Sequence, residues 1–533
     1  MKIFWMTLFT GIFICILLHM LQREQGFRWA RDKHKADTDQ KEDLEIVQMD
    51  TQNQLVRVVL RTTGFTNLYH ENVRLGLQGN YQIVIRDEED EEKAVENTRI
   101  EEIKEIKEIE VSNFQLNEGE SIAFKPMDQD ASITVESIER NVSGKYPTYG
   151  GSLEIYKEAE GYLIVNELSI ETYLQGVLPS EMPGSYPLEA LEAQAICART
   201  YALKTMEYHR MEEYHGDMDD STSYQVYQNR DGTERTQSAV ANTAGKVLMK
   251  DHSLMETCYY ATSCGVGEEG SITRQNRLKN SGEANYNEEI KPVEETRFSE
   301  ETKPGEETKF SEEIKPGEET RFSEEIKPGE ETKFIEETKP VEETKFSEET
   351  KPGEETKCGE EIKRDEEKKS SEEINLSEEK KFQKYIRKLH RGDYESAEPW
   401  YRWNGTLNKH KLESLSELGE IQKITVTGRL PSGRIEALRI KGKEGTREIT
   451  GEYQIRSILA EAVSCVMTQD GKEQPISGLL PSAYFFLVPK GKGGYTILGG
   501  GYGHGIGMSQ NAAKHMAEEQ MDCESILRFF YED

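Results

Sequence analysis

Short runs of β-branched and aromatic residues, bounded by Gly, Asn and Asp, dominate the hydrophobic pattern from residue 54 onward. Such runs are typical of β-strands, so we expect a β-rich N-terminal region over residues 54–148. Further strands are expected in both later parts of the chain. The predicted strands are 55–60, 81–85, 121–124, 133–138, 153–156, 162–166, 246–249, 421–426, 435–440 and 484–488.

The clearest helical pattern lies at Pro187–Met206. Leu191, Ala195 and Ala198 follow the spacing of a buried helical stripe, and proline suits the first turn of a helix. The segments 383–389, 400–403 and 412–418 are expected to be helices or loops, a helix is expected over 510–519, and an apolar segment follows at 526–531. Helices and strands together predict an α+β fold, with a mixed domain after the β-rich region.

The first 21 residues are apolar from Ile3 to Leu21, with only Thr7, Thr10 and His19 as interruptions. About 20 apolar residues suffice to span a bilayer. No small-residue cleavage pattern follows, which favours an uncleaved signal-anchor over a removed signal peptide. Five basic residues follow the span, a bias that favours a cytoplasmic C-terminal side. Polar residues 22–53 are interpreted as a tether.

A ladder of Glu-Glu pairs recurs at every sixth residue from 288 to 378 without a gap. Because six residues advance a helix by about 600°, this repeat forms no single apolar face. Its Pro-Gly pairs break helices and strands alike, and one Phe per twelve residues buries too little to offset ordering of the chain. We expect a disordered acidic insertion over residues 271–381, with a spacer or wall-interacting arm as the functional alternative.

The net charge of −33 comes from 67 Lys and Arg against 100 Asp and Glu. The repeat region 288–381 contributes 33 acids and 18 bases, and residues 87–110 contribute 12 acids and 4 bases. These two segments carry −23, so the remaining residues are only mildly acidic. The acidic balance argues against a nucleic-acid binder, which needs clustered Lys and Arg.

Glu181 is expected in a turn bounded by Pro179, Pro183 and Gly184, just before the predicted helix. Burial between apolar neighbours raises the pKa of a carboxyl and allows it to donate a proton near neutral pH. A nearby helix N-terminus acts in the opposite direction. The alternative is a helix-capping or surface glutamate.

The second candidate segment is the glycine-rich run Gly499–Gly507, which contains His504. Glycines let the backbone approach a ligand closely and hold an imidazole in a tight turn. A nucleotide-binding glycine loop is a weak alternative, because the spacing of neither common phosphate-binding motif is present.

The third candidate is His252, Cys258 and Cys264, whose side chains are potential zinc ligands. The spacing is wider than the usual paired cysteines. A Cys258–Cys264 disulfide and two free buried thiols are the alternatives.

Several segments occur in one order that resembles stage II sporulation protein D (SpoIID) and the amidase enhancer LytB. They are Val165–Val177, Pro179–Pro183, Pro187–Ala202 and Gly501–Gln510, with a shorter match at Tyr224–Tyr227. The resemblance covers about residues 150–265 and 382–533, so the acidic repeat interrupts a SpoIID-type domain.

The resemblance implies a lytic transglycosylase that cuts peptidoglycan between N-acetylmuramic acid and N-acetylglucosamine and leaves a 1,6-anhydro end. Glu181 matches the glutamate of the family's Ser-Glu-Met motif and is the expected catalytic residue. Some relatives bind zinc near this domain, with Ser263 standing here where a further His ligand is expected. The candidates for glycan binding are Gln194, Arg199 and Tyr201, on the exposed side of the helix, and His504, Ser509 and Gln510.

The resemblance also implies a single-pass membrane protein, anchored through residues 3–21, with its catalytic domain on the outer face. Its expected partners are glycan strands, an amidase or endopeptidase of the SpoIIP type and a membrane protein of the SpoIIM type. The alternatives are a non-catalytic amidase enhancer and a glycan-binding scaffold. The expected organisation is anchor 1–21, tether 22–53, β-rich region 54–148, first half-domain 149–270, insertion 271–381 and second half-domain 382–533.

Overall fold

The computed structural model describes residues 44–87, 100–103, 107–140, 146–228, 232–267, 375–491 and 494–532. The predicted signal-anchor, most of the predicted tether and nearly all of the predicted acidic insertion lie outside these residues. None of the helices formed by the described residues is long and apolar enough to cross a membrane. All the described residues belong to one compact unit, and the mixture of helices and strands confirms the α+β class.

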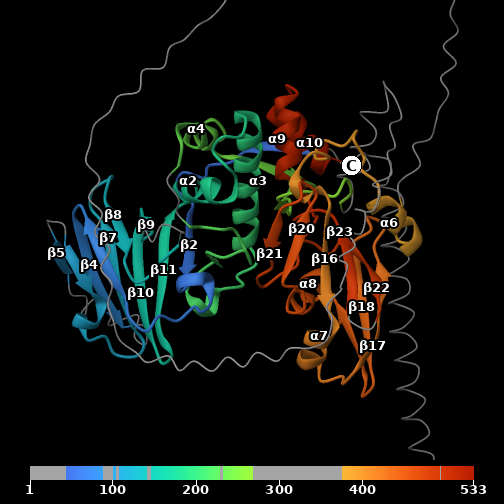
Figure 1. Cartoon of the computed structure of the whole chain (residues 1–533). Coiled ribbons are helices and arrows are strands. Elements are labelled where there is room, and N and C mark those ends of the chain that lie inside the picture. Colours follow the sequence, from blue (N-terminus) through green and yellow to red (C-terminus); the bar gives the residue numbers. More distant parts are fainter. Residues whose placement is uncertain are drawn as a thin grey trace, which may run out of the picture. The chain divides into compact units, whose positions relative to one another are not determined.

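Two sheets of the N-terminal half share one hydrophobic core (Figure 1). In β2 the alternate residues Val56, Val58 and Leu60 are buried in it, as expected for a strand with one face on a core. The seven-stranded sheet has the order β12 (Met218–Asp219), β2 (Leu55–Leu60), β11 (Gly161–Ser169), β10 (Ser152–Glu158), β7 (Glu120–Pro126), β4 (Tyr81–Asp87), β5 (Ile100–Ile103). The four-stranded sheet has the order β6 (Lys107–Glu110), β3 (Arg74–Gln78), β8 (Ser132–Val135), β9 (Thr148–Tyr149).

The sequence predicts a domain boundary at residue 148, but the seven-stranded sheet contains strands from both sides of that residue. β10 pairs with β7, and β11 pairs with β2, in continuous antiparallel ladders. The β-rich region and the first half-domain therefore share one sheet and one core. The short helices η1 (Thr63–Phe65), η2 (Val111–Phe114) and η3 (Glu212–Tyr214) lie in its connections.

Three helices follow the sheet: α2 (Ile170–Glu181), α3 (Leu188–Met206) and α4 (Glu234–Asn242). α3 confirms the strongest helix prediction to within one residue. A small sheet formed by β1 (Glu45–Gln48), β13 (Lys246–Lys250) and β14 (Ser253–Leu254) lies beside it. The predicted tether is thus folded at its C-terminal end, because β1 pairs with β13 and Leu44 is buried.

The second half contains a five-stranded and a three-stranded sheet around a separate core. The five-stranded sheet has the order β21 (Glu473–Pro475), β20 (Cys465–Thr468), β16 (Trp403–Asn408), β23 (Gly494–Gly499), β22 (Phe485–Lys490). The three-stranded sheet has the order β17 (Ile421–Arg429), β18 (Ile435–Gly442), β19 (Thr446–Thr450). Around them lie α6 (Glu379–Ile386), η4 (Pro399–Tyr401), α7 (Lys409–Ser416) and α8 (Glu452–Ala460).

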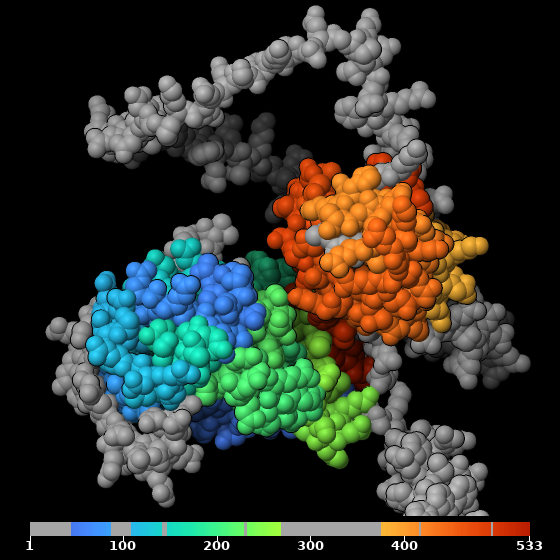
Figure 2. Space-filling model, turned by 90° about the horizontal axis from the view of Figure 1, so that it is seen from below, coloured from blue at the N-terminus to red at the C-terminus, as the bar shows by residue number. Residues whose placement is uncertain are grey.

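The last two helices, α9 (Gln510–Glu518) and α10 (Cys523–Tyr531), join the two halves by packing on α3. β15 (Tyr259–Tyr260) pairs in parallel with β24 (Met508–Ser509) at the same place. In Figure 2 the green residues of the first half accordingly lie against the dark red C-terminal residues, beside the orange second half. The predicted site segments are therefore brought together from both halves of the domain.

Candidate active site

Glu181 is the last residue of α2 rather than part of a turn. The helix starts after Ser169, whose hydroxyl caps the first turn. It ends at Glu181 because Met182 precedes Pro183 and is extended, with φ −133° and ψ 134°, as expected of a residue before proline. The carboxyl therefore lies at a helix C-terminus, where the helix dipole disfavours a negative charge.

The carboxyl of Glu181 has two hydrogen-bond partners. The backbone N–H of Val226 donates to its Oε1 at 2.6 Å, and the hydroxyl of Tyr259 donates to it as well. Tyr259 is free to do so because Gln225 Nε2 donates to its oxygen at 3.0 Å. Burial nevertheless outweighs both bonds and raises the pKa of Glu181 to about 7. Both protonation states are therefore accessible near neutral pH.

Among the described residues, no second carboxylate influences the pKa of Glu181. Across the described ranges, the influences on its pKa are burial, Val226 and Tyr259, and no other acidic group is among them. The residue keeps some exposed surface, so a substrate can reach it. The site thus offers one exchangeable proton in a largely apolar, tyrosine-lined setting.

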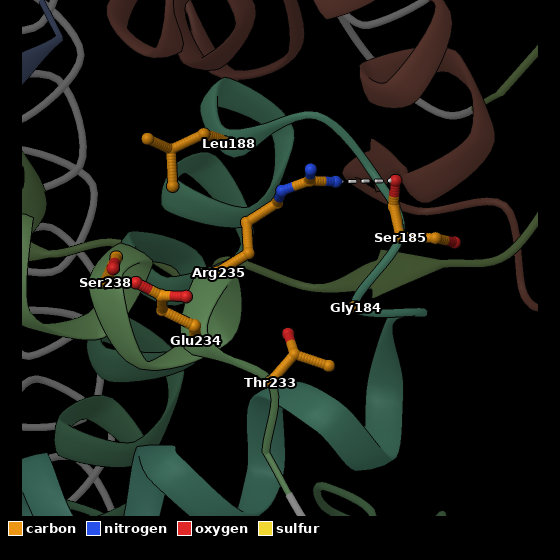
Figure 3. Close-up of a pocket in the computed structure, with 7 residues that line it drawn as sticks. All are labelled: Gly184, Ser185, Leu188, Thr233, Glu234, Arg235 and Ser238. Atoms are coloured by element: carbon orange, nitrogen blue, oxygen red, sulfur yellow. Dashed lines mark hydrogen bonds between the residues drawn. The ribbon is translucent and has the colours of Figure 1, made fainter.

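An open hollow of about 680 Å³ adjoins the loop that follows Glu181 (Figure 3). Arg235 of α4 extends towards the loop and donates from Nη1 to the carbonyl oxygens of Ser185, at 2.9 Å, and Tyr186, at 3.1 Å. A Cβ on Gly184 would lie 2.7 Å from the side chain of Thr233, so glycine allows the loop to approach α4. The hollow is lined by Gly184, Ser185, Leu188, Thr233, Glu234, Arg235 and Ser238.

The glycine run packs against residues 258–264 rather than enclosing a phosphate. A Cβ on Gly503 would lie 2.6 Å from that of Tyr260, and one on Gly507 would lie 1.9 Å from the carbonyl oxygen of Cys258. Both glycines have positive φ, at 122° and 73°, which other residues rarely adopt. The glycines therefore allow two backbone segments, one from each half, to lie side by side.

His504 is held by backbone groups on both ring nitrogens. The Ile506 N–H donates to Nδ1 at 3.2 Å, so Nε2 carries the proton and donates to the Tyr259 carbonyl oxygen at 3.0 Å. Burial lowers the pKa of this imidazole, which keeps it neutral. His504 thus fixes the backbone of Tyr259, whose hydroxyl contacts Glu181, while its side chain stays partly exposed.

The prediction that Gln194 and Arg199 lie on an exposed side of α3 is wrong, because both side chains are fully buried. α3 lies between two hydrophobic cores, so these turns have no solvent-facing side. Tyr201 is partly exposed and lies close enough to Tyr259 to raise the pKa of its hydroxyl. Tyr201, which is partly exposed and close to the Tyr259 partner of Glu181, remains a candidate for substrate contact.

Ser509 and Gln510 are also buried, and both side chains form hydrogen bonds to other side chains of the protein. Gln510 Nε2 donates to Gln194 Oε1 at 3.4 Å. Ser509 donates to Oε1 of Glu395 at 2.6 Å, and Glu395 also accepts hydrogen bonds from the backbone and the hydroxyl of Ser263. Glu395, which no sequence pattern singles out, therefore links both halves to the start of α9.

Glu395 should make the stability of the fold depend on pH. Burial raises its pKa to about 7, so its contribution to the free energy of unfolding is fully present below about pH 4.5 and lost as pH rises through 7. This shift corresponds to about 3 kcal/mol. Urea unfolding of Glu395→Gln between pH 5 and 8 should show a shallower decline than wild type. The same slope as in the exposed control Glu461→Gln would contradict this role.

The residues predicted to bind zinc do not fit a metal site. Among the described residues, which include His252, Cys258 and Cys264, no group of three or more His, Cys, Asp or Glu could hold a metal ion. His252 is exposed, whereas Cys264 is buried. Burial raises the pKa of both thiols, which disfavours the thiolate that zinc requires. Both cysteines are free, so the alternative disulfide is not formed either.

Comparison with known families agrees with this arrangement. A family model described as stage II sporulation protein, SpoIID, matches residues 158–249. This match spans β11, α2, α3 and α4 and thus includes Glu181. A second model, described as a domain of unknown function, matches residues 356–507.

Three curated relatives share parts of the chain. Stage II sporulation protein D of Bacillus subtilis is 32% identical over 162 residues, 26% of this chain and 47% of that protein. The amidase enhancer of the same organism is 40% identical over 96 residues, 18% of this chain and 12% of that protein. An uncharacterized protein of Brachyspira hyodysenteriae is 37% identical over 128 residues, 22% of this chain and 32% of that protein.

The chain thus spans less than half the length of each of these relatives. The residues matched by the family model include Glu181 and the long helix α3. Residues 158–249 therefore carry a domain that matches the SpoIID family model, and the chain is similar in part to stage II sporulation protein D and to the amidase enhancer.

Proposed function

We propose that the chain is a lytic transglycosylase that cleaves the glycan strands of peptidoglycan during sporulation. The observation that carries the proposal is Glu181, a lone buried carboxyl whose pKa is raised to about 7. Ordinary glycosidases use two carboxyl groups that flank the scissile bond. A lytic transglycosylase needs one carboxyl that first donates and then accepts a proton.

In the first step, protonated Glu181 donates its proton to the oxygen that links the muramic acid C1 to the next sugar. The C1–O4 bond breaks, and the muramyl 6-hydroxyl attacks C1 in place of water. Glu181, now a carboxylate, takes the proton of that hydroxyl as the C1–O6 bond forms. The enzyme returns to its starting protonation state, and the product carries a 1,6-anhydro end.

Val226 and Tyr259 suit this cycle because their hydrogen bonds favour the carboxylate formed after the first step. Burial favours the neutral acid that starts the cycle. The opposing effects place the pKa of Glu181 between those of a solvated carboxyl and an unbonded buried one, which is the condition for acid and base roles in one turnover.

The pH dependence of the reaction should follow this pKa. Glu181 is the acid required at the start, so kcat/KM should be high below about pH 7 and fall as pH rises through 7. Initial rates on denuded glycan strands between pH 5 and 9 would measure this fall in kcat/KM. A value of kcat/KM that is flat or rising across pH 7 would contradict the assignment of Glu181 as the acid.

The proposal is tested by the products. Full-length protein incubated with denuded glycan strands should release anhydromuramyl fragments that mass spectrometry detects, and Glu181→Gln should release almost none. The relative named amidase enhancer suggests the alternative. Stimulation of a purified amidase by both wild type and Glu181→Gln, without anhydro products, would support that alternative and overturn the transglycosylase.

We further propose that residues 3–21 anchor the chain in the cell membrane, with the domain on the outer face where peptidoglycan lies. This placement runs against the five basic residues that follow the span, although large domains are translocated largely regardless of such charges. A reporter fused to the C-terminus tests the orientation. Amidases of the SpoIIP type and membrane proteins of the SpoIIM type are the proposed partners.

A further inference from the structure

Tyr502 is unusual among the residues of the glycine run because 44% of its surface is exposed. Its backbone is nonetheless fixed: its N–H donates to the Thr262 carbonyl oxygen at 2.7 Å, and its own carbonyl oxygen accepts from the Thr262 N–H at 3.1 Å. The ring therefore projects from a rigid backbone and presents an apolar surface to solvent.

Trp400 completes an aromatic pair with Tyr502. The two ring centroids lie 4.7 Å apart with an interplanar angle of 46°, and the Gly501 N–H donates to the Trp400 carbonyl oxygen at 2.8 Å. Trp400 is itself only partly buried. The pair thus forms a pre-ordered aromatic surface that loses little conformational freedom when a ligand binds.

A chain of hydrogen bonds connects this pair to the loop that follows Glu181. Thr262, which pairs with Tyr502, accepts a bond at its Oγ1 from Asn511 Nδ2 at 2.9 Å. Asn511 Oδ1 accepts in turn from the hydroxyl of Tyr186 at 2.5 Å. Lys514 Nζ lies 5.5 Å from the centre of the Tyr186 ring. Aromatic rings and polar side chains therefore alternate from the catalytic loop to Trp400.

We infer that Tyr186, Asn511, Tyr502 and Trp400 form a glycan-binding strip that holds sugar rings of the strand away from the cleaved bond. The C–H face of a pyranose suits the electron-rich face of an aromatic ring, and amide and hydroxyl groups beside the rings suit its hydroxyl and acetamido substituents. The strip rests on the proposed function and deepens it, because it assigns residues that hold the strand on which Glu181 acts.

Binding is measured in a Glu181→Gln background, in which strands are not cleaved. The full chain is titrated with denuded glycan strands by calorimetry. Tyr502→Ala should weaken binding roughly tenfold, as expected for one lost aromatic contact, whereas Tyr502→Phe should bind like the parent. Tyr453→Ala, which removes an exposed tyrosine on α8, is the matched control and should leave the dissociation constant unchanged.

Tryptophan fluorescence gives a second readout. The chain has four tryptophans, of which Trp5 and Trp29 lie outside the described residues and Trp403 is only 2% exposed. Strand binding at the strip should change the emission of the partly exposed Trp400, and Trp400→Leu should remove that change. Absence of binding by the parent, or equal binding by Tyr502→Ala, would overturn the strip even if wild type makes anhydro products. Binding that depends on Tyr502 without any such products would retain the strip and overturn the proposed reaction.

Discussion

Replacing Glu181 with glutamine is expected to lower the rate of glycan cleavage by about 10²–10⁴-fold, the usual contribution of general acid–base catalysis. Glutamine retains the shape of the side chain and accepts the hydrogen bond from the Val226 N–H, but it has no acidic proton to donate. Because Glu181 serves both proton transfers, no remaining carboxyl at the site replaces it in either step.

Initial rates of strand cleavage, followed by chromatography of the released fragments, measure this effect. The matched control is Glu212→Gln, an exposed carboxyl on η3, which should cleave at the wild-type rate. Glu181→Gln should also unfold at no lower urea concentration than wild type above pH 7, because it removes a buried carboxylate. A Glu181→Gln rate equal to that of the control would contradict the catalytic role.

Replacing Arg199 with leucine is expected to destabilise the fold by about 3–5 kcal/mol, the usual cost of breaking a buried ion pair from one side. The Arg199 guanidinium donates to both oxygens of Glu171, at 2.8 and 2.7 Å, and to the carbonyl oxygens of Lys246 and Val240. Without it, the carboxylate of Glu171 keeps, among the described residues, the Thr51 hydroxyl and the Gly245 N–H as partners.

Urea unfolding gives the free-energy change, and Arg199→Lys is the informative companion. Lysine keeps the charge but lacks the two-pronged geometry of the guanidinium, so it should recover only part of the lost stability. If Arg199 instead contacts glycan, Arg199→Leu should raise KM and leave the stability unchanged. That result would contradict the structural role of Arg199.

The sequence predicts most of the regular structure because the apolar spacing is local information. The stripe of Leu191, Ala195 and Ala198 locates α3, and the β-branched run at 55–60 locates β2. α2 is missed because Pro179 lies inside it and Pro183 follows it, a pattern that resembles a turn. The helix instead ends only at Glu181, and this changes which helix end acts on the carboxyl.

The site is predicted less completely because its contacts depend on the tertiary fold. Glu181 is identified from its motif, but its partners Gln225, Val226 and Tyr259 are not. The segment Tyr224–Tyr227 is recognisable from the sequence because it resembles the corresponding segment of the family. Sequence spacing does not show, however, that its backbone donates a hydrogen bond to Glu181. Glu395 carries no local signal at all, because its partners lie 132 and 114 residues away.

The prediction of an exposed face on α3 fails for a related reason. Small residues such as Ala190, Ala193 and Cys197 lie opposite the predicted stripe, and they allow a second core to pack there. A helix with apolar or small residues all round is buried. Polar residues within it, such as Gln194 and Arg199, are then structural rather than available to a substrate.

The most direct test of the account is the source of the oxygen at the newly formed glycan end. Denuded strands are digested in water enriched in heavy oxygen, and the fragments are weighed by mass spectrometry. Intramolecular attack by the 6-hydroxyl predicts anhydromuramyl ends without heavy oxygen in wild type and almost no fragments with Glu181→Gln. Reducing ends that carry heavy oxygen would show that water attacks and would contradict the single-carboxyl transglycosylase.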